Sequence, residues 1–408
     1  MAYSVIISPR DPVIVRDGRP FDVGSRMKSL AWPTPSLLAG SLRSVVGLRR
    51  NGGNTFSPEL VQEVLKLSLA GPLGYADGKL WLPAPRDIVC HAKGTGYMTL
   101  RPQHLETDEG CDLPHPSLLP MGVNKDVKAT PCAPLWSMDN LLEWLLNPTK
   151  RGFNVPKETH IFGGKLAPLP DRDPRTHSAV DPDNLAVKDG NLFETVGLDF
   201  ERVKAENEDH RKQFHDQPLE MLVQITDAAG FEPELSSLDV LHPLGGERRL
   251  ARWRVNSAVD ELWCCPKEIS DALSNTTQVR MVLATPALFK NGWLPGWLQE
   301  DKGYLEGVPP GLQEGDVRLR LTGAVLDRWQ PISGWSVEKG KTGPKPVRRM
   351  VGSGAVYFFD VVPGQGQASK LANVWLAPVS DDIEDRRDGF GLALWGVSEH
   401  EQNNGKRK

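Results

Sequence analysis

The clearest pattern of apolar positions in the chain follows a proline-rich start. Pro33 and Pro35 exclude a helix before this point, but Pro35 suits a first helical turn with Thr34 or Ser36 as the N-cap. Gly40 inside the helix costs about 1 kcal/mol relative to alanine, so it suggests that another backbone approaches closely there. The predicted apolar face consists of residues at helical spacing: Leu37, Leu38, Leu42, Val45, Val46 and Leu48.

The other patterns are mostly those of β-strands. Strict alternation at Arg318–Leu321 is typical of a half-buried strand, and Asp189-Gly190 predicts a hairpin turn. The order strand, helix, hairpin, helix, strand, followed by a second strand-rich set, predicts an α+β fold of two ferredoxin-like βαββαβ domains. The strand-like runs lie at 5–7, 13–15, 175–180, 191–200, 221–226, 247–255, 279–285, 347–361 and 389–396.

A change of pattern sets the predicted domain organisation. Residues 1–270 form the first domain, 271–400 the second, and 401–408 a flexible tail. Residues 75–170 are rich in Pro, Gly and His, so we interpret them as a large loop-rich insertion in the first domain, with Met138–Leu146 as a short helix.

Composition is that of a soluble globular protein. The chain has 408 residues, 39% hydrophobic and 25% charged, with a formal net charge of −4. No run approaches the roughly 18 apolar residues of a membrane helix, and the N-terminus has no signal-peptide pattern. The five cysteines are therefore expected to be free thiols in a reducing cytoplasm.

Local charge departs from the slightly acidic total. Residues 10–50 hold eight Lys and Arg against three Asp, a balance of +5, and Lys339–Arg349 holds five cations and no acid. Such segments suit a surface that follows phosphates, and Trp32, Trp329 and Trp335 could stack on unpaired bases. Solvated charges and buried tryptophans are the alternative interpretation.

Motifs with known chemistry are weak. The glycine-rich turns Gly245-Gly246 and Gly352-Ser353-Gly354 match neither a phosphate-binding loop nor a dinucleotide fingerprint, and both could be tight turns. No GxSxG or HExxH motif occurs. A zinc site remains an alternative, although no CxxC or HxxxH pair supports it. Its candidate ligands are Cys90, His91, His104, Cys111, His115 and Cys132.

Six motifs in order resemble a known family. The combination is similar to the RAMP proteins of CRISPR effector complexes, and among them to the third subunit of the type III-B Cmr complex. The motifs are RDGRPF at 16–21, WPTPSLLAGSLR at 32–43, RTHSAVD followed by DGNLFET, LGGERR at 244–249, GSGAVYFF at 352–359 and GFGLALWG at 389–396.

The resemblance implies a non-catalytic, cytoplasmic subunit with two RAMP domains and no cofactor or metal. It implies binding of the 5′ repeat-derived tag of CRISPR RNA, docking on the large polymerase-like subunit and a backbone subunit, a thumb from the insertion, and only indirect contact with target RNA. Arg43 could instead be buried against a carboxylate such as Asp17. The expected RNA-binding residues are Arg16, Arg19, Ser36, Gly40, Arg43, Arg175, His177, Gly245, Gly246, Arg248, Arg348, Arg349, Gly352 and Gly354.

Two other functions stay open at this point. A RAMP endoribonuclease that processes guide RNA would use His177 as general acid or base, because histidine titrates near neutrality. A zinc-dependent enzyme would use the cluster between Cys90 and Cys132.

Overall fold

The fold was obtained as a computed structural model. It describes residues 2–19, 27–53, 56–91, 97–105, 109–122, 129–130, 132–147, 166–203, 218–338 and 340–399. The predicted tail at 401–408 lies outside the described residues, as do Arg26 and Lys339 of the two basic segments.

An eight-stranded antiparallel sheet organises the first part of the chain. Its strands lie in the order β11-β10-β4-β3-β14-β1-β16-β15. Alternate residues of β1 point to opposite faces of the sheet and belong to two hydrophobic cores. Val5 and Ile7 pack in the core that contains the helix α1 (Pro35–Arg50), whereas Ile6 packs in the core that contains the second sheet. The strand bounds are β1 Tyr3–Pro9, β3 Ser68–Ala76, β4 Lys79–Pro83, β10 Leu135–Ser137, β11 Leu166–Ala167, β14 Glu220–Asp227, β15 Asp239–Pro243 and β16 Leu250–Val255.

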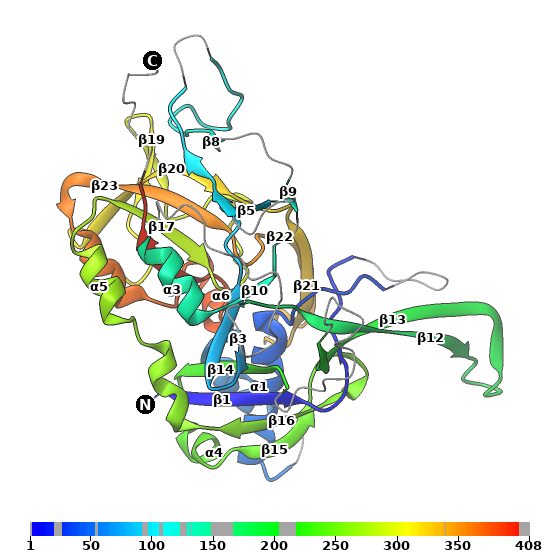
Figure 1. Cartoon of the computed structure of the whole chain (residues 1–408). Coiled ribbons are helices and arrows are strands. Elements are labelled where there is room, and N and C mark those ends of the chain that lie inside the picture. The colour runs from blue at the N-terminus through cyan, green and yellow to red at the C-terminus, as the bar shows by residue number, and fades with distance from the viewer. Residues whose placement is uncertain are drawn as a thin grey trace.

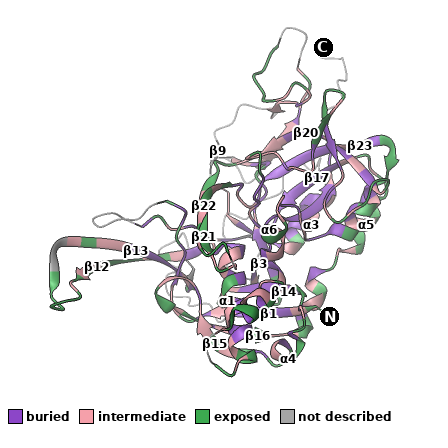
Figure 2. Ribbon diagram, turned by 180° about the vertical axis from the view of Figure 1, so that it is seen from behind, coloured by how far each residue is buried: buried purple, intermediate pink, exposed green. Residues whose placement is uncertain are grey.

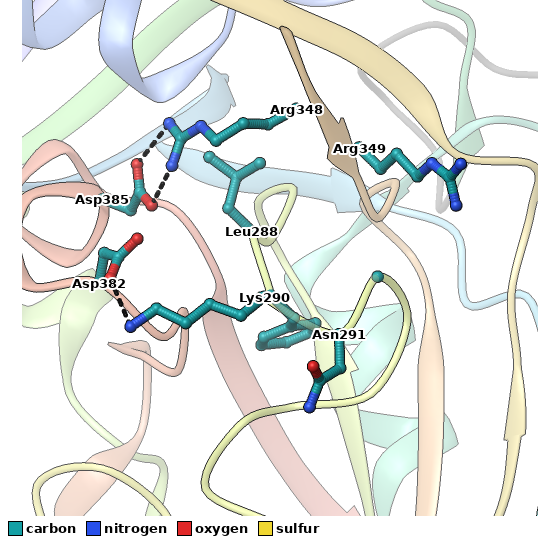
Figure 3. Close-up of a pocket in the computed structure, with 9 residues that line it drawn as sticks. Leu288, Lys290, Asn291, Arg348, Arg349, Asp382 and Asp385 are labelled. Atoms are coloured by element: carbon teal, nitrogen blue, oxygen red, sulfur yellow. Dashed lines mark hydrogen bonds and ion pairs between the residues drawn. The ribbon is translucent and has the colours of Figure 1, made fainter. Parts of the chain in front are cut away.

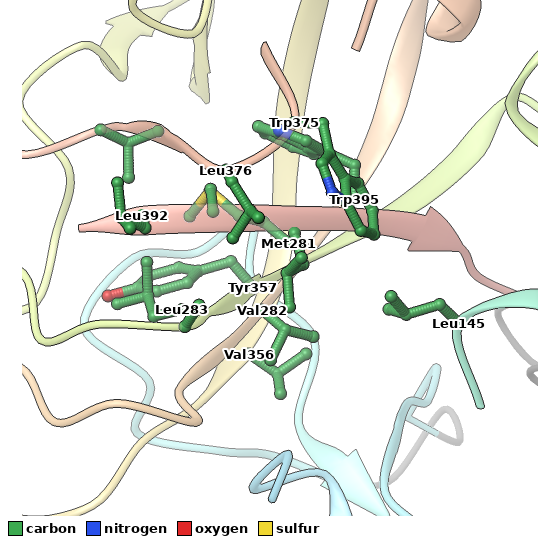
Figure 4. Packing of buried hydrophobic residues seen from close by; sticks show 14 of the residues in the cluster. Leu145, Met281, Val282, Leu283, Val356, Tyr357, Trp375, Leu376, Leu392 and Trp395 are labelled. Carbon is green, nitrogen blue, oxygen red and sulfur yellow. The ribbon is translucent and has the colours of Figure 1, made fainter. Parts of the chain in front are cut away.

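A seven-stranded antiparallel sheet organises the second part. Its order is β18-β19-β20-β23-β17-β25-β24. Met281, Tyr357 and Trp395 lie opposite one another on three adjacent strands and meet in its core (Figure 4). The bounds are β17 Gln278–Leu283, β18 Gln299–Asp301, β19 Tyr304–Gly307, β20 Val317–Val325, β23 Val356–Gly366, β24 Ala377–Pro378 and β25 Leu392–Val397.

Figure 2 shows the two sheets as the main buried regions, with helices around them. Helices and antiparallel sheets together confirm the predicted mixed α+β class. The remaining helices are α2 Pro58–Val64, α3 Met138–Leu146, α4 Glu232–Ser236, α5 Lys267–Leu273 and α6 Ile383–Asp388, with short 3-10 helices at η2 Gly246–Arg248, η3 Ser257–Trp263 and η4 Ala368–Val374.

The predicted helix at Pro35 is confirmed, but its glycine has another explanation. Thr34 is the N-cap and Pro35 opens the first turn. A Cβ added at Gly40 would meet no atom within 4 Å, so the expectation of a close backbone approach by a described segment was wrong. The tightly packed glycine of α1 is Gly47, against the ring of Phe56.

A long hairpin, β12 (Pro170–Val180) and β13 (Val187–Val203), projects from the body of the molecule (Figure 1). The sequence predicted the hairpin but placed its turn wrongly, because Asp189-Gly190 lies within β13. The turn is formed at 181–186, where the Asp181 carboxylate accepts the amide of Asp183 at 2.9 Å and Leu185 has a φ of 56°. Polar side chains that bond their own backbone favour such turns.

The insertion at 75–170 is more ordered than its composition indicates. Its strands β4, β10 and β11 extend the first sheet, and α3 matches the helix predicted at Met138–Leu146. Two small sheets complete its described part. One joins β5 (Ile88–His91), β6 (Tyr97–Thr99) and β9 (Ala129–Thr130), and the other pairs β7 (Arg101–Pro102) with β8 (Met121–Gly122).

The cysteines also differ from expectation. Cys90 and Cys132 form a disulfide, so the prediction that all five are free thiols was wrong. The pairing follows from the small sheet, where Cys90 lies opposite Thr130. Cys111, Cys264 and Cys265 are free, and burial raises the pKa of the Cys265 thiol to about 11. Within the described ranges, no helix is both long and apolar enough to span a membrane.

Candidate nucleic-acid interface

The short strand β2 (Val13–Ile14) is the point where several predicted motifs meet. Ile14 lies opposite Gly197 of β13, so the base of the hairpin covers one side of β2. The glycine-rich turn covers Ile14 from another direction. Sequence segments near residues 197 and 245 therefore both lie against residue 14, although about 180 and 230 positions separate them from it.

The turn at Gly245 requires its glycine. Gly245 has a φ of 79°, and a Cβ there would lie 2.6 Å from the Ile14 carbonyl oxygen. Glu247 and Arg248 also have positive φ, at 56° and 53°. The tight-turn interpretation is thus correct for Gly245, and the turn also presents Arg248 to solvent, where it makes no ion pair with any described residue.

The Arg16–Arg19 turn lies on a second hairpin, formed by β21 (Gln330–Ser336) and β22 (Gly343–Met350). The Gly18 amide donates to the Pro331 carbonyl at 2.8 Å, and a Cβ at Gly18 would lie 2.8 Å from the Ile332 backbone. Arg16 is exposed. Arg19 is exposed too, but its guanidinium pairs with the buried Asp17 at 2.7 Å.

The middle of the β12–β13 hairpin holds Arg175 and His177. Arg175 is exposed and pairs with Asp173 at 2.7 Å. The His177 ring stacks on Phe193 with centroids 5.0 Å apart, and its Nε2 lies 2.7 Å from Thr195 Oγ1. Glu247 of the glycine-rich turn lies 3.9 Å from the same nitrogen. His177 is thus held in place by its own hairpin and faces the glycine-rich turn.

The start of α1 borders this region. Ser41 donates to the Pro243 carbonyl at 2.5 Å, which brings the neighbouring Gly40 close to the strand that leads into the glycine-rich turn. Gly40 is exposed with open space above it, and Ser36 is half-buried with its hydroxyl 3.3 Å from that of Thr34. The small surface at Gly40 is open to an external ligand.

Arg43 does not belong to this face. Its guanidinium is buried, pairs with Asp388 at 2.5 Å and donates to the Leu67 carbonyl at 2.8 Å. The expectation that Arg43 contacts RNA is therefore withdrawn. Its burial against a carboxylate was the alternative, although the partner is Asp388 and not Asp17.

Arg348 and Gly354, two expected RNA-binding residues near the C-terminal motifs, also make contacts within the protein. Arg348 forms a two-bond ion pair with the buried Asp385, at 2.6 and 2.8 Å. Gly354 is buried with a φ of 82°, and a Cβ there would collide with the Ala84 carbonyl oxygen. Both are withdrawn from the RNA face. Gly352 is half-buried with open space at its Cα, and Arg349 is exposed.

A pocket of about 380 Å³ lies beside Arg348. Figure 3 shows Arg348 directed at Asp385 and Lys290 at Asp382, whereas Arg349 points away from both acids. Burial raises the pKa of the Asp385 carboxyl, against the lowering effect of Arg348. Arg348 and Lys290 are each matched by a carboxylate, so Arg349 is the one lining cation without an ion pair to a described residue.

Among the described residues, the candidate zinc ligands are not assembled. The sulfurs of Cys90 and Cys132 are bonded to each other, so neither is a thiolate ligand. His115 Nδ1 lies 2.8 Å from the Ser117 hydroxyl. No group of three potential ligand residues was found within the described part of the chain.

Sequence reasoning missed the acids that decide which arginines are free. Asp388 and Asp385 lie 345 and 37 positions from their arginine partners, so no local spacing signals either pair. Asp17 and Asp173 each lie two positions from their arginine partners, Arg19 and Arg175, so a local pattern could have suggested both pairs.

Comparison with known families decides the identity. Residues 5–398 match the family described as CRISPR-associated protein (Cas_Cmr3). The chain belongs to the Cas_Cmr3 family. The match extends across both sheets of this Cas_Cmr3 chain and confirms the resemblance carried by the six motifs.

Solved structures give more distant likenesses. A chain of type III-B Cmr-beta bound to cognate target RNA and AMPPnP (state 1) is 13% identical with a TM-score of 0.46, covering 87% of this chain and 86% of that one. A chain of Cmr-beta bound to cognate target RNA is 14% identical with the same TM-score and coverage, at 0.46, 87% and 86%.

A chain of the type III-A Csm3-Csm4 subcomplex is 13% identical with a TM-score of 0.35, covering 88% and 93%. Likenesses this distant add nothing to the assignment of the Cas_Cmr3 family. No curated protein sequence matches the chain.

Proposed function

We propose that this Cas_Cmr3 chain is a non-catalytic subunit of a type III-B Cmr effector complex that holds the 5′ repeat-derived tag of CRISPR RNA. It links the large polymerase-like subunit to the backbone subunits and contacts target RNA only indirectly. Family membership supports the complex, and the arrangement around β2 supports the RNA face.

The observation that carries the RNA face is the meeting of sequence-distant motifs at β2. Arg16, two residues after β2, and Arg248, in the turn that covers Ile14, are exposed cations. Gly40 lies beside the strand that enters the glycine-rich turn. Exposed cations next to small residues and loop amides suit close approach by a phosphate backbone. The retained residues are Arg16, Arg19, Ser36, Gly40, Arg175, His177, Gly245, Gly246, Arg248, Arg349 and Gly352.

The strand orders support two ferredoxin-like units. In the first sheet the central order β3-β14-β1-β16 corresponds to strands 2-3-1-4 of a βαββαβ unit, with α1 and α4 as its connections. In the second sheet β20-β23-β17-β25 repeats this order. Its first connection, residues 284–316, carries the β18–β19 hairpin in place of a helix.

A binding role needs no nucleophile, because single-stranded RNA is held by phosphate contacts, stacking and 2′-OH contacts. The contacts of His177 support a positioning role within the hairpin, since its ring lies against Phe193 and Thr195. No contact among the residues that the structure describes favours the endoribonuclease or zinc-enzyme alternatives.

The test is equilibrium binding of RNA with the repeat-derived tag across a salt series. We expect Arg16→Glu and Arg248→Glu each to weaken binding and to reduce the slope of log affinity against log salt by about 0.7, the value for one phosphate contact on a single strand. Far-ultraviolet circular dichroism checks that the variants are folded.

Lys267→Glu is the matched control. Lys267 is an exposed cation at the start of α5, on the opposite flank from the hairpins (Figure 1), and an acid is favourable at a helix N-terminus. Equal affinity and equal salt slope in all three charge-reversal variants would overturn the proposed face.

A further inference from the structure

The hairpin β21–β22 carries two tryptophans that the fold leaves uncovered. Trp329 is 53% exposed and Trp335 is 65% exposed, in a protein where the large aromatic residues of the cores are buried. A single exposed apolar side chain is normal, but two large aromatic side chains exposed on one hairpin mark a candidate interaction surface. Figure 2 shows this hairpin at the surface, with exposed residues along both strands.

The strand register and a contact of Arg349 place both tryptophans on one face. Pro331 lies opposite Arg349 and Trp335 lies opposite Pro344, and directly opposed residues share a face. Pro331 and Trp335 follow the two-residue period of β21, because the extra residue of the bulge lies in β22. Trp329 directly precedes β21, and the centre of its ring lies 5.2 Å from the guanidinium of Arg349, the residue opposite Pro331. We call this set, Trp329, Pro331, Trp335, Pro344 and Arg349, the tryptophan face.

The other face of the hairpin packs on the protein. Ile332 is 6% exposed, and Arg348 opposite it reaches inward to Asp385. The hairpin is therefore anchored, and the tryptophan face is directed outward as a fixed surface.

Charge on this face suits an anionic chain. The Arg349 guanidinium lies 5.2 Å from the centre of the Trp329 ring and forms no ion pair with a described residue. Arg328, next to Trp329, is exposed. The turn that carries Arg16 is hydrogen-bonded to Pro331, on the edge of β21 that does not pair with β22. The tryptophan face thus continues directly into the face proposed for the RNA tag.

We infer that the tryptophan face binds unpaired bases of single-stranded RNA by stacking. The inference rests on the proposed function and adds the residues that hold bases, as distinct from phosphates. Trp329 and Trp335 are six residues apart, roughly 20 Å along an extended strand, so separate nucleotides contact each ring. Aromatic platforms beside cations are a common means of holding single strands without reading their sequence.

The experiment compares Trp329→Ala and Trp335→Ala in the full chain, with a short fluorescein-labelled single-stranded RNA as probe. We expect each substitution to weaken binding about 5-fold or more, while Trp335→Phe retains most of the affinity. Because stacking releases no counterions, the salt slope stays that of the unsubstituted protein, unlike the slopes of the Arg16 and Arg248 variants.

Tyr304→Ala is the control, since Tyr304 is an aromatic residue of the second sheet that is 41% exposed. If Arg248→Glu weakens binding but both tryptophan variants bind as Tyr304→Ala does, the stacking inference fails and the proposed function stands. If neither class weakens binding, the proposed function fails. Unchanged RNA affinity with loss of a copurifying Cmr subunit would make this a protein-docking surface and overturn the inference.

Discussion

Replacing Asp87 with alanine is expected to lower the free energy of unfolding by about 3–5 kcal/mol, because it leaves a buried charge without its partner. Asp87 and Arg280 form an ion pair of 3.0 Å with side chains 0% and 1% exposed. Burial raises the pKa of the Asp87 carboxyl and lowers that of the Arg280 guanidinium, and each charge opposes the shift of the other.

The remaining contacts of Arg280 explain why it cannot move to water. Its guanidinium lies 4.4 Å from the centre of the Trp144 ring and also donates to the Trp144 carbonyl. The pair thus joins the insertion and α3 to β17 of the second sheet. Urea unfolding followed by circular dichroism measures the loss, and hydrogen exchange in β17 reports whether it is local.

The double variant Asp87→Leu with Arg280→Met separates charge from packing. Replacing both charges with apolar side chains of similar size is often neutral or stabilising, so we expect it to recover most of the loss. Asp139→Ala, which breaks the exposed pair with Lys79, is expected to change little. An Asp87→Ala protein as stable as Asp139→Ala would contradict this account.

Arg43→Ala is expected to give the second large effect, again a loss of about 3–5 kcal/mol of stability. The Arg43 and Asp388 side chains are 10% and 11% exposed, and they join α1 of the first sheet to α6 of the second. Removal of Arg43 also leaves the Leu67 carbonyl without a donor. Thermal unfolding and RNA binding should be measured on the same preparations.

The comparison with Arg16→Ala makes this prediction specific. Arg16 is exposed, so its loss should weaken RNA binding with little change in the unfolding midpoint, whereas Arg43→Ala should do the reverse once the unfolded fraction is accounted for. A folded Arg43→Ala protein that unfolds like wild type but binds RNA poorly would return Arg43 to the RNA face.

The predictable parts of the fold were those with local causes. A proline at the first turn and a helical apolar period fixed α1, and Met138–Leu146 was strongly enough patterned to be found inside the insertion. The strand β4 was missed although it forms a hairpin with β3 through the two-residue turn Asp77-Gly78, which is a local signal. The strand β10 was missed because its partner lies far along the chain: Trp136 pairs with Leu82. Pairing between segments so far apart depends on how the whole chain folds back on itself, and a short apolar run does not specify that.

The candidate site, like the fold, could be predicted only where its cause is local. The motifs could be identified from the sequence. Which of their side chains can reach RNA depends on burial and on ion pairs with acids far along the chain, and the sequence does not show either. Arg43 and Arg248 are both arginines within family motifs, so nothing in the sequence separates them. In the structure Arg43 forms an ion pair with Asp388, whereas Arg248 forms none with a described residue. The basic segment that follows the two tryptophans of the tryptophan face could suggest that they are exposed. Trp32 is distinguished from them only by the structure, where its ring packs against Phe200.

The bond between Cys90 and Cys132 makes the intervening segment a covalent ring, with a sequence separation of 42. A protease that cuts the backbone once inside this ring would release no fragment. The nicked chain would run as a full-length species in electrophoresis without reductant and as two pieces after reduction. Apparent resistance to limited digestion in oxidising buffer would then report the ring, not the compactness of the insertion.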